Sequence, residues 1–275
     1  MPSQSPECKL RELLRMEKKM IYVMSDIHGC FEEFLCMLKK IKFTDKDEMY
    51  ILGDAIDRGG GSIPLLLYIA KTSNMHLLLG NHEAMMRDAI ASGDKNLWFI
   101  NGGTVTYKQY ILLSKEERNA IFEYISELPL LKLIEVNGKK YYLAHSTFKK
   151  EESYLYMNMQ DEEYNVVWER EYNRYKYIKT EYPETYNKYK GYTLIAGHTP
   201  TIKLLYKEVV NCTLKGIQYK THIYKGKHYI NIDCGMAGDT NKIKKIRLGC
   251  LRLDDMKEFY VEKKDQLWRR KEFNV

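Results

Sequence analysis

Three short polar segments, each placed directly after an apolar run, constrain the fold of this chain more than any other feature. The segments are residues 25–29 (Ser-Asp-Ile-His-Gly), 51–60 (Ile-Leu-Gly-Asp-Ala-Ile-Asp-Arg-Gly-Gly) and 79–83 (Leu-Gly-Asn-His-Glu). The apolar runs are residues 20–24, 49–52 and 75–79, and they are typical of buried β-strands. Because ligands of open α/β sheets bind outside the carboxyl ends of the strands, we expect all three segments to meet at one edge of a sheet.

Helical patterns separate these predicted strands. Residues 31–41 carry apolar side chains at helical spacing, and residues 82–92 read as a further helix. Between them, Ser62 is expected to cap a helix that has Pro64 in its first turn and reaches about residue 71. The alternation of strand and helix favours a mainly parallel sheet. His76 falls inside the third strand and is expected to be a core histidine.

The rest of the chain predicts a second sheet. An Asn-Gly turn between the apolar runs 131–136 and 139–144 is a strong hairpin signal. Residues 93–106 read as a loop, and Ser114 with Glu117 fits a capping box for a helix that ends near residue 128. Further strands are expected at residues 193–196, 219–224, 228–232 and 249–253. The predicted fold class is α/β, with two packed sheets and helices outside them.

The composition is that of an ordinary globular protein. The chain has 275 residues, a formal net charge of +7, and no apolar run near the ~20 residues of a membrane span. The six cysteines form no close pair and the N-terminus has no apolar signal region, so we expect a cytoplasmic protein with reduced thiols; a zinc ribbon is the less favoured interpretation. We expect one domain over residues 20–263, preceded by a lead-in at 1–19 and followed by a charged tail at 264–275.

Tyrosine is unusually frequent, with 23 residues, many of them between Tyr154 and Tyr192. One interpretation of this segment is an RNA-stacking surface. The other, which we favour, is an irregular cap inserted at about residues 150–192 whose tyrosine rings are half buried. No nucleic-acid partner is therefore expected.

Polar side chains with metal-binding atoms follow the predicted strands. They are Asp26, His28, Asp54, Asn81, His145 and His198. Oxygen ligands mixed with imidazoles suit divalent transition metals, and six ligands suffice for two ions if one carboxylate bridges them. Asp54 is the natural bridge because it lies on the central segment. Two ions about 3.5–4 Å apart can activate a water as hydroxide and bind a phosphoryl oxygen, so the set predicts hydrolysis of phosphate esters.

Three further residues fit that chemistry. His82 is placed to protonate the leaving oxygen as general acid, and Asp57 is the obvious carboxylate to orient it. The guanidinium of Arg58 matches phosphate oxygens in a two-pronged way. Taken singly, an Asp after a strand is often a turn residue, and an Arg beside Gly is usually solvated. The occurrence of all these residues together favours the functional interpretation, because unrelated turns would not supply a complete set of metal ligands.

These residues resemble the phosphoprotein phosphatase (PPP) branch of the calcineurin-like metallophosphoesterases. The family pattern is Asp-x-His-Gly, then Gly-Asp-x-x-Asp-Arg-Gly, then Gly-Asn-His-Glu, then two later histidines; it is matched in order from about residue 20 to 255. The resemblance implies a four-layer metallophosphoesterase β-sandwich flanked by α-helices. Bacterial-type members also carry a Trp-x-Arg segment in the cap that supplies a second phosphate-binding arginine, and Trp168 with Arg170 is similar to it.

Roles follow from the resemblance by position. One metal would be held by Asp26, His28 and Asp54, and the other by Asp54, Asn81, His145 and His198. His82 with Asp57 would be the acid pair, and the phosphate would be bound by Arg58, Arg170 and Asn81. Three imidazoles favour a softer ion than Mg²⁺, so we expect Mn²⁺, with Fe, Zn or Ni as alternatives. The implied activity is that of a serine/threonine protein phosphatase, with a phosphoprotein or phosphopeptide as substrate.

Two other functions remain open. Symmetric diadenosine tetraphosphate hydrolases resemble this pattern closely but typically carry Ala at the position of Asp57 and Asp at that of Glu83, so the residues present favour a phosphatase. A non-catalytic phosphoprotein-binding module would be expected to have lost a ligand, and none is missing. The chain departs from the family at Ser146 and Thr147, where Ala-Gly or Gly-Gly is frequent, and at Gly60, where Pro is usual. Neither departure removes a ligand.

Overall fold

The computed structural model describes most of the predicted domain. The described residues are 19–149, 163, 166–170, 179–180, 182–215, 217–238 and 245–264. The predicted lead-in up to residue 18, the C-terminal tail from residue 265 and most of the tyrosine-rich insert therefore lie outside the described residues.

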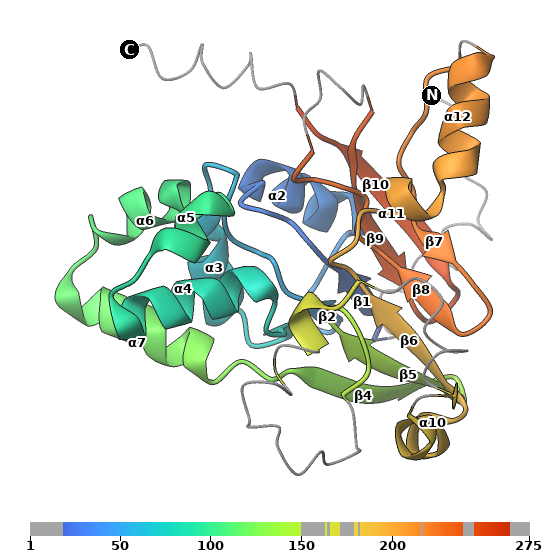
Figure 1. Ribbon diagram of the computed structural model, residues 1–275, viewed down its shortest axis with the longest axis horizontal. Coiled ribbons are helices and arrows are strands. Elements are labelled where there is room, and N and C mark those ends of the chain that lie inside the picture. Colours follow the sequence, from blue (N-terminus) through green and yellow to red (C-terminus); the bar gives the residue numbers. More distant parts are fainter. Residues whose placement is uncertain are drawn as a thin grey trace, which may run out of the picture.

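The first sheet holds the three predicted parallel strands at its centre and one edge (Figure 1). Its order is β10-β9-β1-β2-β3, with bounds β1 (Ile21–Met24), β2 (Glu48–Ile51), β3 (Met75–Leu77), β9 (Arg247–Arg252) and β10 (Lys257–Glu262). Strands β1, β2 and β3 run parallel, whereas β9 and β10 pair antiparallel. The carboxyl ends of β1, β2 and β3 therefore face the same edge.

The second sheet has the order β4-β5-β6-β8-β7. The bounds are β4 (Leu131–Val136), β5 (Lys139–Ala144), β6 (Tyr192–Ala196), β7 (Tyr224–Lys225) and β8 (Tyr229–Asn231). The hairpin β4–β5 has the predicted bounds. Strands β5, β6 and β8 are parallel, so their carboxyl ends also meet at one edge.

The two sheets pack face to face and are covered by helices on their outer faces, which confirms the predicted fold class. The core between the sheets includes Val23, Leu52, Tyr141, Leu143, Ile195 and Ile230. The neighbours of Val23 along β1, Tyr22 and Met24, point to the opposite face and pack against the helices, as the two-residue period of a strand requires. Burying each such aliphatic side chain contributes about 1.5–3 kcal/mol.

Among the described residues, more helices lie on the side of the first sheet than on the side of the second. The helices on that side are α2 (Phe31–Ile41), α3 (Ser62–Lys71), α4 (Asn81–Ser92), α5 (Asn96–Ile100), α6 (Thr104–Tyr110) and α7 (Lys115–Ser126), of which α5 and α7 pack on α4 and α6 packs on α3. Helix α10 (Pro183–Tyr189) packs on the second sheet, and α11 (Thr201–Leu204) and α12 (Tyr206–Leu214) follow β6. The predicted capping box at Ser114 and Glu117 is present at the start of α7.

Several local predictions were wrong. Residues 93–106 are not a loop, because they contain α5 and the start of α6. Ser62 does not cap α3; it is the first helical residue, and its hydroxyl bonds the loop before it instead. Only Tyr224 of the predicted strand 219–224 is extended in a sheet. His76 is no core residue, because its side chain is 41% exposed and pairs with Glu48.

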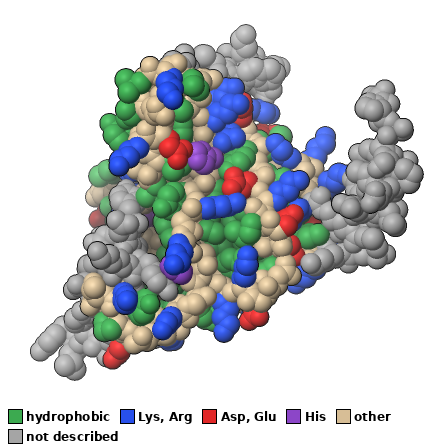
Figure 2. Space-filling model, turned by 90° about the vertical axis from the view of Figure 1, so that its right-hand side faces the viewer, with side chains coloured by type: hydrophobic (Ala, Val, Ile, Leu, Met, Phe, Trp, Pro, Cys, Tyr) green, Lys and Arg blue, Asp and Glu red, His purple; other side chains and the backbone are tan. Residues whose placement is uncertain are grey.

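On the face of the molecule around β7, β8 and α12, the described basic side chains do not gather in one patch. Figure 2 shows the face around β7, β8 and α12, where Lys and Arg side chains alternate with apolar and acidic ones. Such a mixture is typical of a solvated face. Among the described residues, every helix is too short or too polar to span a lipid bilayer.

Candidate metal centre and active site

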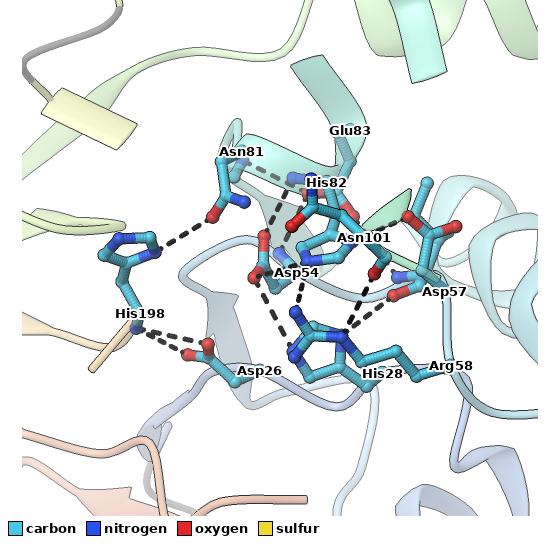
Figure 3. Close-up of polar contacts among 12 residues, drawn as sticks. Asp26, His28, Asp54, Asp57, Arg58, Asn81, His82, Glu83, Asn101 and His198 are labelled. Atoms are coloured by element: carbon cyan, nitrogen blue, oxygen red, sulfur yellow. Dashed lines mark hydrogen bonds and ion pairs between the residues drawn. The ribbon is translucent and has the colours of Figure 1, made fainter. Parts of the chain in front are cut away.

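The strand ends of both sheets bring the predicted site residues together (Figure 3). Those that follow the first sheet are Asp26, His28, Asp54, Asp57, Arg58, Asn81 and His82, and those that follow the second are His145 and His198. All of them are buried except Arg58. Arg170 approaches from the cap segment and is exposed as well. A buried group of acidic, amide and imidazole side chains with two exposed arginines fits an anionic ligand that enters from solvent.

The loops that carry these residues are strained. Six site residues have left-handed backbone conformations: Asp26 (φ 51°), His28 (φ 49°), Asp54 (φ 54°), Asp57 (φ 70°), Arg58 (φ 65°) and His198 (φ 63°). Each such residue costs about 1–3 kcal/mol and persists only where the surroundings fix it. Hydrogen bonds between loops do so here: the backbone N–H of Asp26 donates to Gly53 O (3.1 Å), and that of His28 donates to Asp54 O (2.9 Å). Concentration of strain at one place is typical of a functional site.

Two glycines let the loops approach each other closely. A Cβ at Gly53, which has φ 87°, would lie 2.5 Å from the Cα of Gly80. A Cβ at Gly197 would lie 2.0 Å from the carboxylate of Asp26. Both distances are far below van der Waals contact, so any larger side chain would push the predicted ligands apart.

Glu83 fixes the loop that follows β2 through hydrogen bonds to its backbone. Its buried carboxylate accepts the backbone N–H of Asp54 (2.8 Å), Ala55 (2.9 Å) and Gly80 (3.1 Å). Acceptance of several backbone donors by one carboxylate fixes the loop geometry after β2 relative to the start of α4. Glu83 is therefore a positioning residue, which gives its place in the Gly-Asn-His-Glu motif a physical reason.

Three acceptor atoms converge at the ends of β5, β6 and β3. The Oδ1 of Asn81 lies 2.9 Å from both His145 Nε2 and His198 Nδ1, which are 3.1 Å apart. The other ring nitrogens donate to backbone carbonyls, His145 Nδ1 to Leu52 O (2.7 Å) and His198 Nε2 to Trp168 O (3.0 Å). A neutral imidazole has only one N–H, so both nitrogens beside Asn81 carry lone pairs. Three facing lone pairs repel one another unless a cation lies among them, which fits a metal ion.

Asp54 lies between two groups of possible ligands. Its Oδ1 is 3.4 Å from His145 Nε2, and its Oδ2 is 3.6 Å from His28 Nε2. The groups with ligand atoms within 4.8 Å of one another are His28–Asp54–His82 and Asp54–His145–His198. Burial raises the pKa of Asp54 to about 8, and nearby carboxylates add to the effect. A cation on either side would favour the charged form, so the position suits the predicted bridge.

The first group differs from the predicted ligand set. The Asp26 carboxylate accepts the backbone N–H of His198 (2.9 Å) and the hydroxyl of Ser25, so it links the first sheet to the second. The third member of the group with His28 and Asp54 is His82 and not Asp26, and His82 Nε2 lies 3.8 Å from Asp54 Oδ2. Burial lowers the pKa of His28 well below the usual range, which keeps its imidazole neutral as a ligand must be.

His82 and Asp57 form a tightly supported pair. The Nδ1 of His82 lies 2.6 Å from Asp57 Oδ2. The same carboxylate accepts the indole N–H of Trp98 (2.9 Å) and the hydroxyl of Thr106 (2.6 Å). The backbone N–H of Asp57 donates to the Ser62 hydroxyl (2.9 Å). The donors on His82, Trp98 and Thr106 stabilise the Asp57 carboxylate. Asp57 therefore holds the proton on Nδ1 of His82, and Nε2 of His82 faces the site.

The two arginines lie on opposite sides of the site. Arg58 donates from Nη2 to His82 Nε2 (3.0 Å) and from Nη1 to His28 Nε2 (3.2 Å). Arg170 donates from Nη1 to the carbonyl of His198 (3.1 Å). Both guanidinium groups therefore border the imidazoles, and both are exposed enough to reach an anion from solvent.

The cap segment is tied to the second sheet through Ser146, one of the departures from the family pattern. The Ser146 hydroxyl donates to Glu169 O, and its backbone N–H donates to Val166 O (3.0 Å). Trp168 O accepts His198 Nε2. These bonds flank Arg170, so Ser146 anchors the segment that carries it.

Trp98, Thr106 and Asp233 are site residues that sequence reasoning missed. Neither Trp98 nor Thr106 follows a predicted strand, and both reach Asp57 through the packing of α5 and α6. Asp233 is buried two residues after β8, and burial, followed by the charge of Asp26, raises its pKa well above the usual range. The strand-end rule that selected His145 and His198 also applies to β8 and would have found Asp233.

Comparison with known proteins identifies the family. The calcineurin-like phosphoesterase family matches residues 19–224. Serine/threonine-protein phosphatase 2 of Salmonella typhimurium is 33% identical over 152 residues, which are 55% of this chain and 68% of that protein. The symmetrical bis(5'-nucleosyl)-tetraphosphatase of Salmonella paratyphi B is 29% identical over 127 residues, 46% of this chain and 42% of that protein. A protein serine/threonine phosphatase from Saccharomyces cerevisiae shares the fold, with a TM-score of 0.52 at 16% identity over 89% of this chain and 79% of that chain.

The chain belongs to the calcineurin-like phosphoesterase family and is a hydrolase. The predicted family and fold are thereby confirmed. The family binds a dinuclear metal centre, and this chain brings together aspartate and histidine groups that could hold one.

Proposed function

We propose that this protein is a metal-dependent serine/threonine protein phosphatase. The observation that carries the proposal is the His82–Asp57 pair, with 2.6 Å between Nδ1 and Oδ2, held beside Asp54 and the two groups of possible ligands. An oriented acid next to a metal centre is what hydrolysis of an alkyl phosphate needs, because a serine or threonine oxygen leaves poorly without a proton. The similarity to bacterial serine/threonine-protein phosphatases supports the substrate class.

The proposed ligand sets are those expected from the sequence. Asp26, His28 and Asp54 would hold one divalent ion, and Asp54, Asn81, His145 and His198 the other. When bound, such ions supply an activated water and neutralise charge on the phosphoryl group. We propose Mn²⁺ for both sites, since imidazole-rich sets favour a softer ion than Mg²⁺.

The side chains of this chain would do the rest. His82 would donate the proton at Nε2 to the leaving oxygen while Asp57 stabilises the imidazolium. Arg58 would turn from the two imidazoles to the phosphoryl oxygens, with Arg170 on the opposite side and the Asn81 amide beside them. The five described cysteines are free thiols, which supports a reducing compartment such as the cytoplasm.

Symmetric hydrolysis of dinucleoside tetraphosphates is the second candidate, because one relative has that activity in its name. The Asp57 contact with His82 favours the phosphatase, since a good leaving group such as a nucleotide needs less protonation. An activity panel on Mn²⁺-loaded protein tests both: a phosphoserine peptide, a phosphotyrosine peptide, diadenosine tetraphosphate and a cyclic nucleotide. We expect the phosphoserine peptide to have the highest kcat/KM. A preference for diadenosine tetraphosphate would overturn the proposal, and binding of the phosphopeptide without turnover would indicate a non-catalytic module.

A further inference from the structure

Helix α5 turns one face to the active site and the other to solvent. On the inner face, Trp98 is 1% exposed and donates its indole N–H to Asp57. On the outer face, Leu97 is 61% exposed and Ile100, one turn further along, is 84% exposed. We call Leu97 and Ile100 the α5 ledge. Two large aliphatic side chains on the same exposed face of one short helix are a candidate contact surface.

The α5 ledge adjoins the phosphate-binding side of the site. Ile100 is followed by Asn101, whose carbonyl accepts the Nε–H of Arg58 (3.3 Å), as Figure 3 shows. The carbonyl of Gly102 accepts the backbone N–H of Arg58 (3.3 Å). The ledge therefore begins one residue from the backbone that positions Arg58.

The ledge is also fixed relative to the site. Trp98 anchors α5 through Asp57, which in turn holds His82. The same helix packs against Tyr107 of α6 through Trp98 and Phe99. A surface that moves with the catalytic groups can select substrates by the residues that flank the reacting one.

We propose that the α5 ledge binds an apolar side chain of the phosphoprotein substrate, about two to four residues from the phosphorylated residue. An extended peptide advances about 3.3–3.6 Å per residue. Two to four residues of peptide therefore cover the distance from a phosphate on the Arg58 guanidinium, along the Arg58 side chain and past Asn101, to Ile100. The inference rests on the proposed phosphatase function and names the sequence context that the site selects. A small aryl phosphate does not reach the ledge.

The test compares substrates and variants on the Mn²⁺-loaded full chain. Phosphoserine peptides carry a single Leu at each flanking position in turn, with Ser elsewhere, and p-nitrophenyl phosphate is the small substrate. The variant combines Leu97→Ser and Ile100→Ser. The control is Leu214→Ser, because Leu214 is 81% exposed on α12, at the opposite end of the molecule from α5 (Figure 1). Sedimentation velocity records the oligomeric state of each protein.

We expect the parent to prefer Leu at one position within four residues of the phosphoserine, with a KM about tenfold lower than for the all-Ser peptide, a ratio that corresponds to about 1.4 kcal/mol. The ledge variant should lose that preference while its kinetics on p-nitrophenyl phosphate and on the all-Ser peptide stay within about twofold. Leu214→Ser should retain it.

Hydrolysis of all peptides without Leu preference, or a preference that survives the ledge variant, overturns the inference alone. A change of oligomeric state in the ledge variant also overturns it, in favour of contact with a second copy. Hydrolysis of p-nitrophenyl phosphate but of no phosphopeptide overturns the proposed function and the inference with it.

Discussion

The two halves of the site differ in where their hydrogen-bond donors come from. In the acid half, Asp57 receives donors from His82, Trp98 and Thr106, so its carboxylate is satisfied by the protein itself. In the metal half, Asn81, His145 and His198 face one another with acceptor atoms, and the N–H groups of the two histidines point away to backbone carbonyls.

The two halves should therefore respond differently to the loss of a side chain. The hydrogen bonds of the acid half are satisfied without a ligand. Substitution of a residue in that half should therefore reduce catalysis and leave metal binding intact. The metal half is electrostatically incomplete without a cation, so loss of one member should release metal. Substitutions in each half, assayed for metal content and for activity, separate these two responses.

The largest effect should come from the metal half. His198→Ala removes one of the facing nitrogens, and we expect the bound metal to fall from two ions to one per chain and kcat/KM on an aryl phosphate to fall at least about 10³-fold. Metal analysis of purified protein and steady-state kinetics measure both. His222→Ala is the matched control, since His222 pairs with Glu208 away from the site. Unchanged metal content in His198→Ala would show that the facing acceptors are not ligands.

In the acid half, His82→Asn should lower kcat on a phosphoserine peptide by about 10²–10⁴-fold, the usual size of a general-acid contribution. Metal content should stay near that of the parent. The loss should shrink for an aryl phosphate, because its leaving oxygen needs less protonation. His76→Asn serves as control on an exposed histidine. Loss of metal in His82→Asn would instead make His82 a ligand, as its position near Asp54 and His28 allows.

The arginines should give an intermediate effect. Arg58→Ala should cost about 10²-fold in kcat/KM, with both kcat and KM affected, because contacts to the phosphoryl group strengthen as charge develops. Arg58→Lys should rescue little, since an ammonium cannot form the two-pronged contact. Arg170→Ala should cost less, because Arg170 comes from the cap and not from the loop beside Asp57. If Arg170→Ala stays within about twofold of the parent on a phosphopeptide, Arg170 is a solvated cap residue and leaves the site.

The smallest effect should come from the support of the acid pair. Trp98→Phe keeps most of the buried ring but removes one donor to Asp57, and a hydrogen bond to a charged group is worth about 1.5–3 kcal/mol. We expect kcat to fall about tenfold on a phosphoserine peptide and less on an aryl phosphate. Thermal unfolding and kinetics on both substrates measure this. An equal loss on the two substrates would mean that Trp98 acts on the fold and not on the acid pair.

The sequence predicted which polar side chains would meet, because their positions follow from strand ends. Asp26, Asp54 and His145 come directly after apolar runs, and parallel strands deliver such residues to one edge whatever the rest of the fold does. The support of the acid pair could not be predicted in this way. Trp98 lies in a five-residue helix that tertiary contacts stabilise, before a Gly-Gly pair that local rules assign to a loop. His76 was misplaced because its strand lies at the edge of the sheet, where a side chain can face solvent.

A Mn²⁺ titration of fully chelated protein, with the initial rate on a phosphoserine peptide as readout, tests the proposed dinuclear metal centre most directly. We predict no measurable activity in the metal-free protein and full recovery with two equivalents of Mn²⁺ per chain, with weaker recovery by Mg²⁺. Full activity in the chelated protein would contradict the assignment of Asp26, His28, Asp54, Asn81, His145 and His198 to a catalytic metal centre.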